Sequence, residues 1–202
     1  MEMSRPAAGL RERKKRKTRD TIVRVAADLF AEHGYEKTTI AEIAEAAEVS
    51  PRTIFAYFPS KEDILFCDFP ELEERLAQAL RERPEGTTAL DALREFIVGS
   101  LVPDHAAMVR KSIVANDETL QRGERARFAP LEELMVAAIA EDLGAGPDDI
   151  RPRIVAAALT AAFTAVHDPA APPQPKSPAE AMAKIDDVMG FLRGGLEALR
   201  HG

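Results

Sequence analysis

The chain has no tryptophan, two tyrosines and one cysteine among its 202 residues. One cysteine cannot form an internal disulfide, and acidic neighbours would raise the pKa of its thiol, so Cys67 is expected to be structural rather than a redox switch. An apolar run of about twenty residues is missing, as is the apolar segment of a signal peptide. With few β-branched runs and 46% hydrophobic residues, the sequence predicts an all-α, cytoplasmic protein with no membrane partner.

Motifs of catalysis and of metal binding are missing too. No His-Glu-x-x-His, Cys-x-x-Cys, Gly-x-Ser-x-Gly or glycine-rich phosphate loop occurs. His105 and His167 each stand beside an aspartate, but adjacent side chains point to different faces of a helix. We therefore expect no enzyme activity, no cofactor and no metal.

Positive charge is concentrated near one end of the chain. Residues 5–24 carry nine Lys or Arg and two acids, a net charge of +7, although the whole chain has a net charge of −7. This distribution is typical of a protein that binds a polyphosphate through one element, and each cation placed near a phosphate adds sequence-independent affinity. We expect residues 1–15 to be a flexible basic arm that contacts DNA; the alternative is a solvated tail. Helical spacing of apolar residues begins near Leu10 and ends at Gly34.

Two short helices joined by a tight turn are predicted after this segment. Thr39 and Glu42 have the spacing of a capping box, and Ser50 followed by Pro51 is a favoured helix start. Pro59 ends the second helix. A helix with short polar or cationic side chains near its N-terminus suits the major groove of DNA. The same caps occur in ordinary helical bundles, so it is the basic segment that favours DNA.

Further helices follow to the end of the chain. Ser60 and Asp63 are spaced as a second capping box, which opens a helix expected to continue to about Arg83. Later punctuation predicts helices that start near Thr88 and Pro103, a helix after Gly123 that ends at Gly144 and is kinked at Pro130, and helices over 148–167 and 178–199. Residues 168–178 form a proline-rich linker. The expected total is nine helices.

Residues 18–65 resemble the DNA-binding domain of the tetracycline-repressor (TetR) family. The stretches DLFAEHG, TTIAEIA and YFPSKEDIL carry the resemblance. It implies a recognition helix over 51–58, with Arg52 and Thr53 as groove readers, Tyr57 as a backbone clamp, and Thr39 and Lys61 as phosphate anchors. The full set of expected DNA contacts is Lys14, Lys15, Arg16, Lys17, Thr38, Thr39, Ser50, Pro51, Arg52, Thr53, Phe55, Tyr57 and Lys61.

Two residues depart from the family pattern. Glu48 stands where the family usually has glycine in the turn between the helices, so the turn is expected to be strained or differently shaped. Phe55 stands where tyrosine is common, so a phosphate hydrogen bond from that hydroxyl is absent.

The resemblance also implies a helix-turn-helix domain over 16–60 and an effector-binding and dimerisation domain over 61–202. A small, apolar or aromatic effector is expected in the second domain, although Met and Phe at helical spacing are more often plain core. The candidate effector residues are Phe96, His105, Met108, Asn116, Phe128, Met135, Thr160, Phe163 and His167. Effector binding is expected to tilt the helix that begins at Ser60.

The last two helices are expected to form a homodimer interface. Each carries an apolar stripe at helical spacing, and two such pairs can build a four-helix bundle. The alternative is that both stripes face the core of their own subunit. The stripes are Ile154, Ala158, Ala162 and Val166, and Ile185, Val188, Met189, Leu192, Leu196 and Leu199.

Together these features predict a dimeric transcriptional regulator that binds a palindromic operator in duplex DNA. We expect a repressor that a small-molecule effector releases from its operator. The alternative is a helical ligand-binding or protein-interaction module without specific DNA binding. Dimeric, strongly salt-dependent binding to upstream DNA would separate the two.

Overall fold

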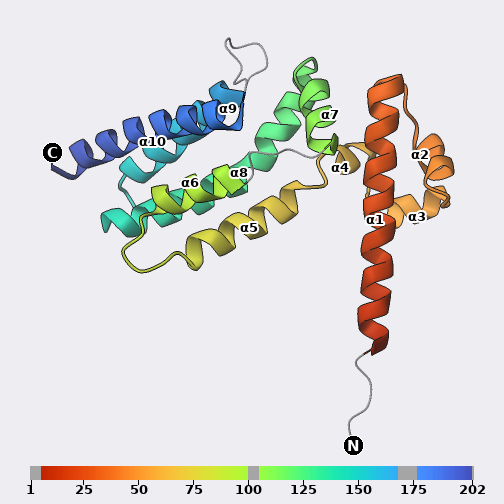
Figure 1. Cartoon of the computed structure of the whole chain (residues 1–202), viewed down its shortest axis with the longest axis horizontal. Coiled ribbons are helices and arrows are strands. Elements are labelled where there is room, and N and C mark those ends of the chain that lie inside the picture. The colour runs from red at the N-terminus through yellow and green to blue at the C-terminus, as the bar shows by residue number, and fades with distance from the viewer. Residues whose placement is uncertain (1–5, 100–104, 168–176, 202) are drawn as a thin grey trace, which may run out of the picture. The chain divides into compact units, whose positions relative to one another are not determined.

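The computed structural model of the chain describes residues 6–99, 105–167 and 177–201. These residues contain ten α-helices and no strand, which confirms the all-α prediction (Figure 1). They divide into two compact units. The described residues 6–68 and 105–121 form the first unit, and residues 69–99, 122–167 and 177–201 form the second. None of the helices in these ranges combines the length and the apolar character needed to cross a membrane.

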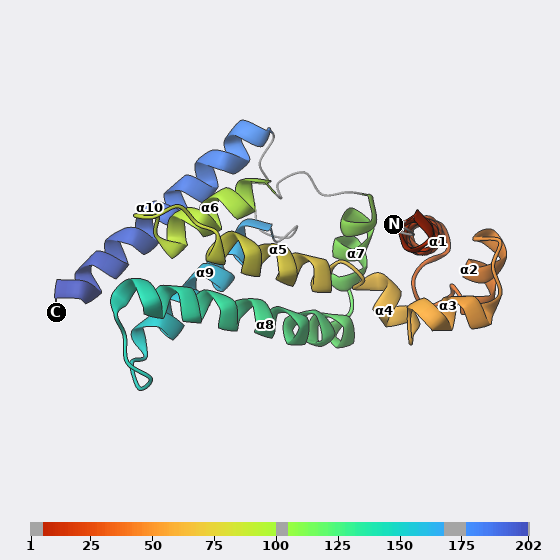
Figure 2. The same cartoon turned by 90° about the horizontal axis from the view of Figure 1, so that it is seen from below.

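The first unit is built around one long helix. Helix α1 (Pro6–His33) contacts α2 (Ile40–Ala46), α4 (Lys61–Leu65) and α7 (His105–Val114), while α3 (Pro51–Tyr57) packs on α2. Seen along its axis in Figure 2, α1 has α7 on one side and α2 on the other. Apolar residues at helical spacing make this core, chiefly Ile22, Ala26, Phe30, Ile43, Ile54 and Phe58.

The second unit is a helical bundle. It contains α5 (Phe69–Arg81), α6 (Ala89–Gly99), most of α8 (Glu118–Leu143), α9 (Arg151–His167) and α10 (Pro178–His201). Helix α5 packs on α6, and α10 packs on both α6 and α9. Ion pairs support the packing of α10: Arg94 of α6 donates to Asp186 at 2.6 Å, and Arg193 of α10 bonds to Asp91 of α6. The core residues include Leu90, Leu93, Ile139, Leu159 and Met189.

The helix expected to continue from Ser60 to Arg83 is broken, so that prediction was wrong. Helix α4 ends at Leu65, and α5 starts at Phe69. The cause is Pro70, which has no N–H and whose ring would clash with the carbonyl of Phe66 in a continuous helix. Proline is tolerated in the first turn of a helix, so the chain ends one helix and starts another. This break raises the number of helices from nine to ten among the described residues.

The predicted flexible arm is helical from Pro6 onward, so α1 is 28 residues long rather than about twenty. Proline suits the first helical position because its missing N–H has no helical partner there. Alanine, leucine, arginine, lysine and glutamate, which fill most of the following positions, are good helix formers.

Two helix starts also differ from the prediction. Helix α8 begins before Gly123, because the carboxylate of Asp117 accepts the N–H groups of Thr119 at 2.8 Å and Leu120 at 3.0 Å. Helix α9 begins at Arg151 rather than near Asp148, and Asp149 accepts the Arg151 N–H at 2.9 Å. The helix start expected at Pro103 and linker residues 168–176 lie outside the described residues.

Candidate nucleic-acid interface

Helix α2 starts with the predicted capping box. The Thr39 N–H and hydroxyl both donate to Glu42 Oε2, at 2.7 and 2.8 Å, and the Glu42 N–H donates to Thr39 Oγ1 at 3.2 Å. These two hydrogen bonds from Thr39 hold the pKa of the Glu42 carboxyl below its usual value. The box satisfies free N–H groups at the helix start and leaves Thr39 exposed beside α3.

The turn between α2 and α3 holds a strained residue. Glu48 has a φ of +54°, the left-handed region that a Cβ atom disfavours. The turn is nevertheless closed by backbone hydrogen bonds, from Glu48 N–H to the Glu45 carbonyl at 3.0 Å and from Val49 N–H to the Ala44 carbonyl at 2.9 Å. The chain therefore keeps the glycine-type turn and bears the strain at Glu48, as the departure from the family pattern predicted.

Helix α3 presents a mixed polar and aromatic surface. The Ser50 hydroxyl accepts the Thr53 N–H at 3.1 Å, and Pro51 occupies the first turn, as predicted. Ile54 and the following Phe58 are buried and fix the helix against the rest of the unit. As a result Arg52 and Phe55 are exposed, and the side chain of Phe55 is 54% exposed. Among the remaining candidate contacts on this helix, Ser50 and Pro51 are exposed, while Thr53 and Tyr57 are half-buried.

Thr38 is not available for DNA, which corrects the prediction for this residue. Its side chain is 1% exposed, and its hydroxyl donates to the Gly34 carbonyl at 2.9 Å and lies 3.2 Å from the Leu29 carbonyl. Its N–H bonds to Gly34 as well. Thr38 therefore caps the end of α1 and supports the fold.

Lys61 has a structural role that the sequence did not predict. Its ammonium donates to the carbonyls of Tyr35 at 2.7 Å, Thr38 at 3.1 Å and Glu36 at 3.4 Å, and lies 4.3 Å from the centre of the Tyr35 ring. An ammonium has three N–H donors, and three carbonyls surround this one. Lys61 thus ties α4 to the segment after α1, and its role as a phosphate anchor stays a prediction.

Two arginines hold the break between α4 and α5. Arg19 of α1 donates to the carbonyl of Cys67 at 2.5 Å, and its guanidinium lies 5.5 Å from the centre of the Phe58 ring. Arg110 of α7 forms an ion pair with Asp68. The break is therefore fastened from two other helices of the same unit. Burial, and then the charge of Asp68, raises the pKa of the Cys67 thiol to about 11, consistent with a structural cysteine.

The charge of this unit is unevenly distributed. Residues 25–68 hold nine acids and three Lys or Arg, a net charge of −6, although they include α2, α3 and α4. The cations are in α1, where Arg11, Arg13, Lys14, Lys15, Arg16 and Lys17 are all exposed. The exposed cations of this unit are therefore concentrated between Arg11 and Lys17 of α1, and their contact with phosphates stays a prediction.

Comparison with known proteins identifies the first unit. Residues 22–66 match the family described as "Bacterial regulatory proteins, tetR family", and residues 88–197 match the "MftR C-terminal domain". The HTH-type transcriptional regulator TcmR of Streptomyces glaucescens is 35% identical over 168 residues, which cover 76% of this chain and 73% of the relative. The chain belongs to the TetR family. It is a DNA-binding transcriptional regulator with a helix-turn-helix.

Other relatives agree with this assignment. The putative mycofactocin biosynthesis transcriptional regulator MftR of Mycobacterium tuberculosis is 26% identical and covers 94% of this chain and 96% of the relative. FadR of Bacillus subtilis, solved in complex with stearoyl-CoA, has the same fold, with a TM-score of 0.63 at 19% identity over 85% of this chain and 96% of that chain. The resemblance found in the sequence is thereby confirmed.

In this TetR-family chain the candidate effector residues belong to both units. His105, Met108 and Asn116 belong to the first unit and are exposed; His105 lies 3.1 Å from Asp28, and the Asn116 amide donates to the Ser112 carbonyl at 3.0 Å. Their part in effector binding stays a prediction.

The candidates of the second unit are partly buried. They are Phe96, Phe128, Met135 and Thr160, whereas the side chains of Phe163 and His167 lie outside the description. The rings of Phe128 and Phe69 pack edge to face with their centres 5.0 Å apart, and Cζ of Arg75 lies 5.5 Å from the centre of the Phe96 ring. Two of these four candidates, Phe128 and Phe96, therefore already contact another side chain through their rings.

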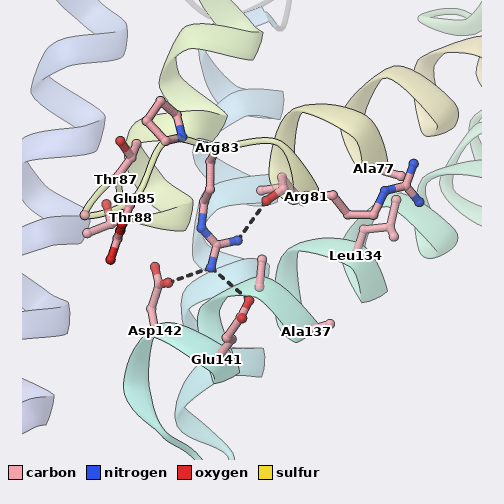
Figure 3. A pocket seen from close by; sticks show the side chains of 14 residues that line it. Ala77, Arg81, Arg83, Glu85, Thr87, Thr88, Leu134, Ala137, Glu141 and Asp142 are labelled. Carbon is pink, nitrogen blue, oxygen red and sulfur yellow. Dashed lines mark hydrogen bonds and ion pairs between the residues drawn. The ribbon is translucent and has the colours of Figure 1, made fainter.

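A surface pocket of about 720 Å³ lies elsewhere in the second unit. None of the candidate effector residues lines it. Figure 3 shows Arg83 crossing it to Glu141 and Asp142, at 2.9 and 3.0 Å. Asp142 also accepts the Ala89 N–H at 2.5 Å, so this ionic group joins α6 and α8 as well as lining the pocket.

The two candidate dimer stripes face different environments. On α10 the residues Ile185, Met189, Leu192 and Leu196 are buried in the protein's own core, and Val188 is half-buried, which agrees with the alternative that this stripe faces the core. The side chain of Leu199 lies outside the description, and a dimer interface on the last two helices stays a prediction. On α9 the core face holds Val155, Ala156 and Leu159 instead, and Ile154 of the predicted stripe is exposed. Helical periodicity predicted which positions of α10 are apolar and buried, but not whether the protein's own core or a second subunit buries them.

A different face of α10 is apolar and exposed. Phe191 is 78% exposed, and its neighbours one turn away on the helix are Asp187, Val188, Gly194 and Gly195, while Gly190 precedes it in the chain. A Cβ atom added to any of these glycines would meet nothing within 4 Å. The packing of the chain itself therefore does not require glycine at these positions, although glycine in a helix costs about 1 kcal/mol relative to alanine.

Proposed function

We propose that this TetR-family regulator is a homodimeric repressor that reads a palindromic operator with α3 and leaves it when a small apolar effector binds the second unit. The observation that carries the proposal is the surface of α3. Its apolar residues Ile54 and the adjoining Phe58 are buried, while Arg52 and Phe55 project into solvent.

The exposed side chains of α3 match the chemistry of the major groove. A guanidinium such as that of Arg52 can bind guanine O6 and N7 together, and an aromatic ring such as Phe55 can contact a thymine methyl group. Ser50, Pro51, Thr53 and Tyr57 flank these two residues, and exposed Thr39 is the candidate phosphate contact of α2. A helix of seven residues reads few base pairs, so two copies on a two-fold axis would supply the specificity.

The outward faces of α9 and α10 are the proposed dimer interface. Phe191 offers a large apolar side chain, and the neighbouring glycines would let a second helix approach closely. Ile154 of α9 is also exposed. An isologous four-helix arrangement would cover these side chains in both subunits.

The partly buried side chains Phe96, Phe128, Met135 and Thr160 are the proposed effector contacts. The structural relative FadR of Bacillus subtilis was solved with stearoyl-CoA, which supports an effector with a long apolar part. An effector lowers operator affinity only by the difference between its affinities for the free and the DNA-bound protein. Phe128→Ala should therefore weaken the response to effector, whereas Thr87→Ala, in the surface pocket, should leave it unchanged.

Binding-site selection from random duplex DNA tests the proposal. The selected sequences should converge on an inverted repeat whose half-sites lie about one helical turn, 34–36 Å, apart, and the complex should contain two protomers. The affinity should fall steeply as salt rises. Selection that yields no consensus, at any salt concentration that still permits binding, would contradict specific operator recognition and favour a ligand-binding or protein-interaction module.

A further inference from the structure

Helix α1 has two parts with different surroundings. From Ile22 onward it is packed in the core, whereas every side chain from Gly9 to Lys17 is exposed. Figure 1 shows these first turns running on past α2 and α3 with no helix of the first unit beside them. We call residues 6–17 the basic extension. At about 1.5 Å per residue, these twelve residues span about 18 Å.

The basic extension is cationic on all sides. Six of the seven residues from Arg11 to Lys17 are Lys or Arg, and seven residues make almost two turns. No carboxylate in the described part of the chain forms an ion pair with any of them. Leu10 is the one large apolar residue in this stretch, so the extension has no apolar face for inserting into a membrane surface.

The helical form of this segment is electrostatically unfavourable in isolation. Arg11 and Lys15, and Arg13 and Lys17, are like charges four residues apart, which destabilises a helix. Arg16 lies four residues after Glu12, and this is the one opposite-charge pair at that spacing between Arg11 and Lys17. A row of anions along the helix would offset this repulsion between like charges.

The segment that contains α2 and α3 cannot itself supply the positive charge that attracts DNA phosphates. Residues 25–68 carry a net charge of −6, so α2 and α3 belong to a segment that phosphates repel. The recognition residues lie on α3, but the charge that attracts DNA lies on the extension. Shape complementarity and phosphate attraction are therefore carried by different helices.

We propose that the basic extension lies along the phosphates of the duplex outside the half-site contacted by α3. Its charged residues 11–17 are about 10 Å long and would lie beside about three base pairs at about 3.4 Å each. The occupant is double-stranded DNA flanking the operator, and each of two protomers would hold one flank. This inference rests on the proposed function, because it assumes that α3 occupies the operator.

The test compares two duplexes: the selected operator without flanks, and the same operator with six more base pairs of arbitrary sequence at each end. Wild-type protein is measured beside the variant Lys14→Gln/Lys15→Gln/Lys17→Gln, in which glutamine keeps a good helix former at each position. The control variant is Arg81→Gln/Arg122→Gln/Arg125→Gln, which removes the same charge from exposed arginines of the second unit.

The flanks should raise the affinity of the wild type and of the control by about tenfold or more at about 0.1 M salt, and that of the lysine variant by less than about twofold. The salt slope of the lysine variant on the long duplex should be lower by about 2.7 per protomer, since each lost phosphate contact removes about 0.9. Helicity of wild type measured by circular dichroism should rise on the long duplex.

Different results separate the inference from the proposed function. Wild-type binding that ignores the flanks, with the operator still recognised, overturns the inference and leaves the proposed function intact. Failure of the wild type to recognise any operator defeats both. Tight binding of wild type to vesicles rich in anionic lipid, lost in the lysine variant while the flanks have no effect, would assign the extension to membranes and also overturn the inference.

Discussion

Phe55 of α3 and Phe191 of α10 are both large apolar side chains in contact with solvent, but their neighbours differ. Phe55 shares its helix surface with Arg52 and lies in a segment with polar caps. Phe191 has Gly194 and Gly195 one turn further along α10 and Asp187 one turn before it, and it points away from the buried stripe. Solvent exposure alone therefore does not distinguish the kind of partner that Phe55 would bind from the kind that Phe191 would bind.

The neighbours indicate the partner. A cation and hydroxyl groups beside an aromatic ring can bond to phosphates and base edges, whereas glycines offer only backbone that another helix can approach. Phe55 is therefore suited to nucleic acid and Phe191 to a second copy of the chain. The following substitutions separate the two roles, beginning with the largest expected effect.

Phe191→Asp should separate the dimer. The proposed dimer would bury Phe191 in both subunits, so its removal should lose roughly 3–6 kcal/mol of dimerisation free energy, and the added carboxylates would also be desolvated. Sedimentation velocity should show monomers, and operator affinity should fall with them. Met108→Asp, at an exposed apolar residue of the first unit, should remain dimeric. A dimeric Phe191→Asp variant would show that the subunits meet through another face.

Arg52→Ala should cost about 1–3 kcal/mol at the operator and relax the preference at one base pair in each half-site. Arg52→Lys is the matched control, because it keeps the charge but cannot bind guanine with two parallel hydrogen bonds. Repeating the binding-site selection with both variants gives the readout. An unchanged consensus with uniformly weaker binding would mean that Arg52 contacts only phosphate.

Phe55→Ala should weaken operator binding by about 1 kcal/mol and leave the dimer intact, the reverse of the pattern expected for Phe191→Asp. The loss should be confined to operators that carry thymine at the contacted position. Fluorescence anisotropy with operators that contain thymine or uracil there measures it, since uracil lacks only the methyl group. Equal losses on the two operators would remove the assigned methyl contact.

Glu48→Gly should have the smallest effect of the four. It relieves the φ of +54° but adds the entropy of glycine to the unfolded chain, so the net stabilisation should be about 0.5–1 kcal/mol. Thermal unfolding measures this change, with Glu45→Gly in α2 as a control that should be destabilised. A less stable Glu48→Gly variant would mean that the carboxylate contributes more than the strained turn costs.

Local signals in the sequence predicted much of the helix-turn-helix. The cap at Thr39, the start at Pro51 and the unusual Glu48 each depend on a few neighbouring residues, and each has the predicted geometry. The break after Leu65 has an equally local cause in Pro70, whereas the capping pattern at Ser60 indicates where a helix begins but not where it ends.

Tertiary packing decided the features that the sequence could not show. The periodic stripe of α10 indicated burial, but the same period fits a core and an interface. Thr38 looked like a surface threonine because its partners, the carbonyls of α1 and Gly34, come from an earlier part of the fold. Residue type predicts which side chains could contact an apolar effector, but it gives no information on whether these side chains share one cavity.

The break at residues 66–68 also changes the mechanics expected of the link between α4 and α5. An unbroken helix is a rod, and a rod tilts as one piece. Two helices separated by a break can also rotate relative to each other, within the limits set by the contacts that hold the break. These contacts come from Arg19, on the helix that carries the basic extension, and from Arg110, on α7. If effector binding acts through this link, weakening either contact should change the response without any bending of α4 or α5.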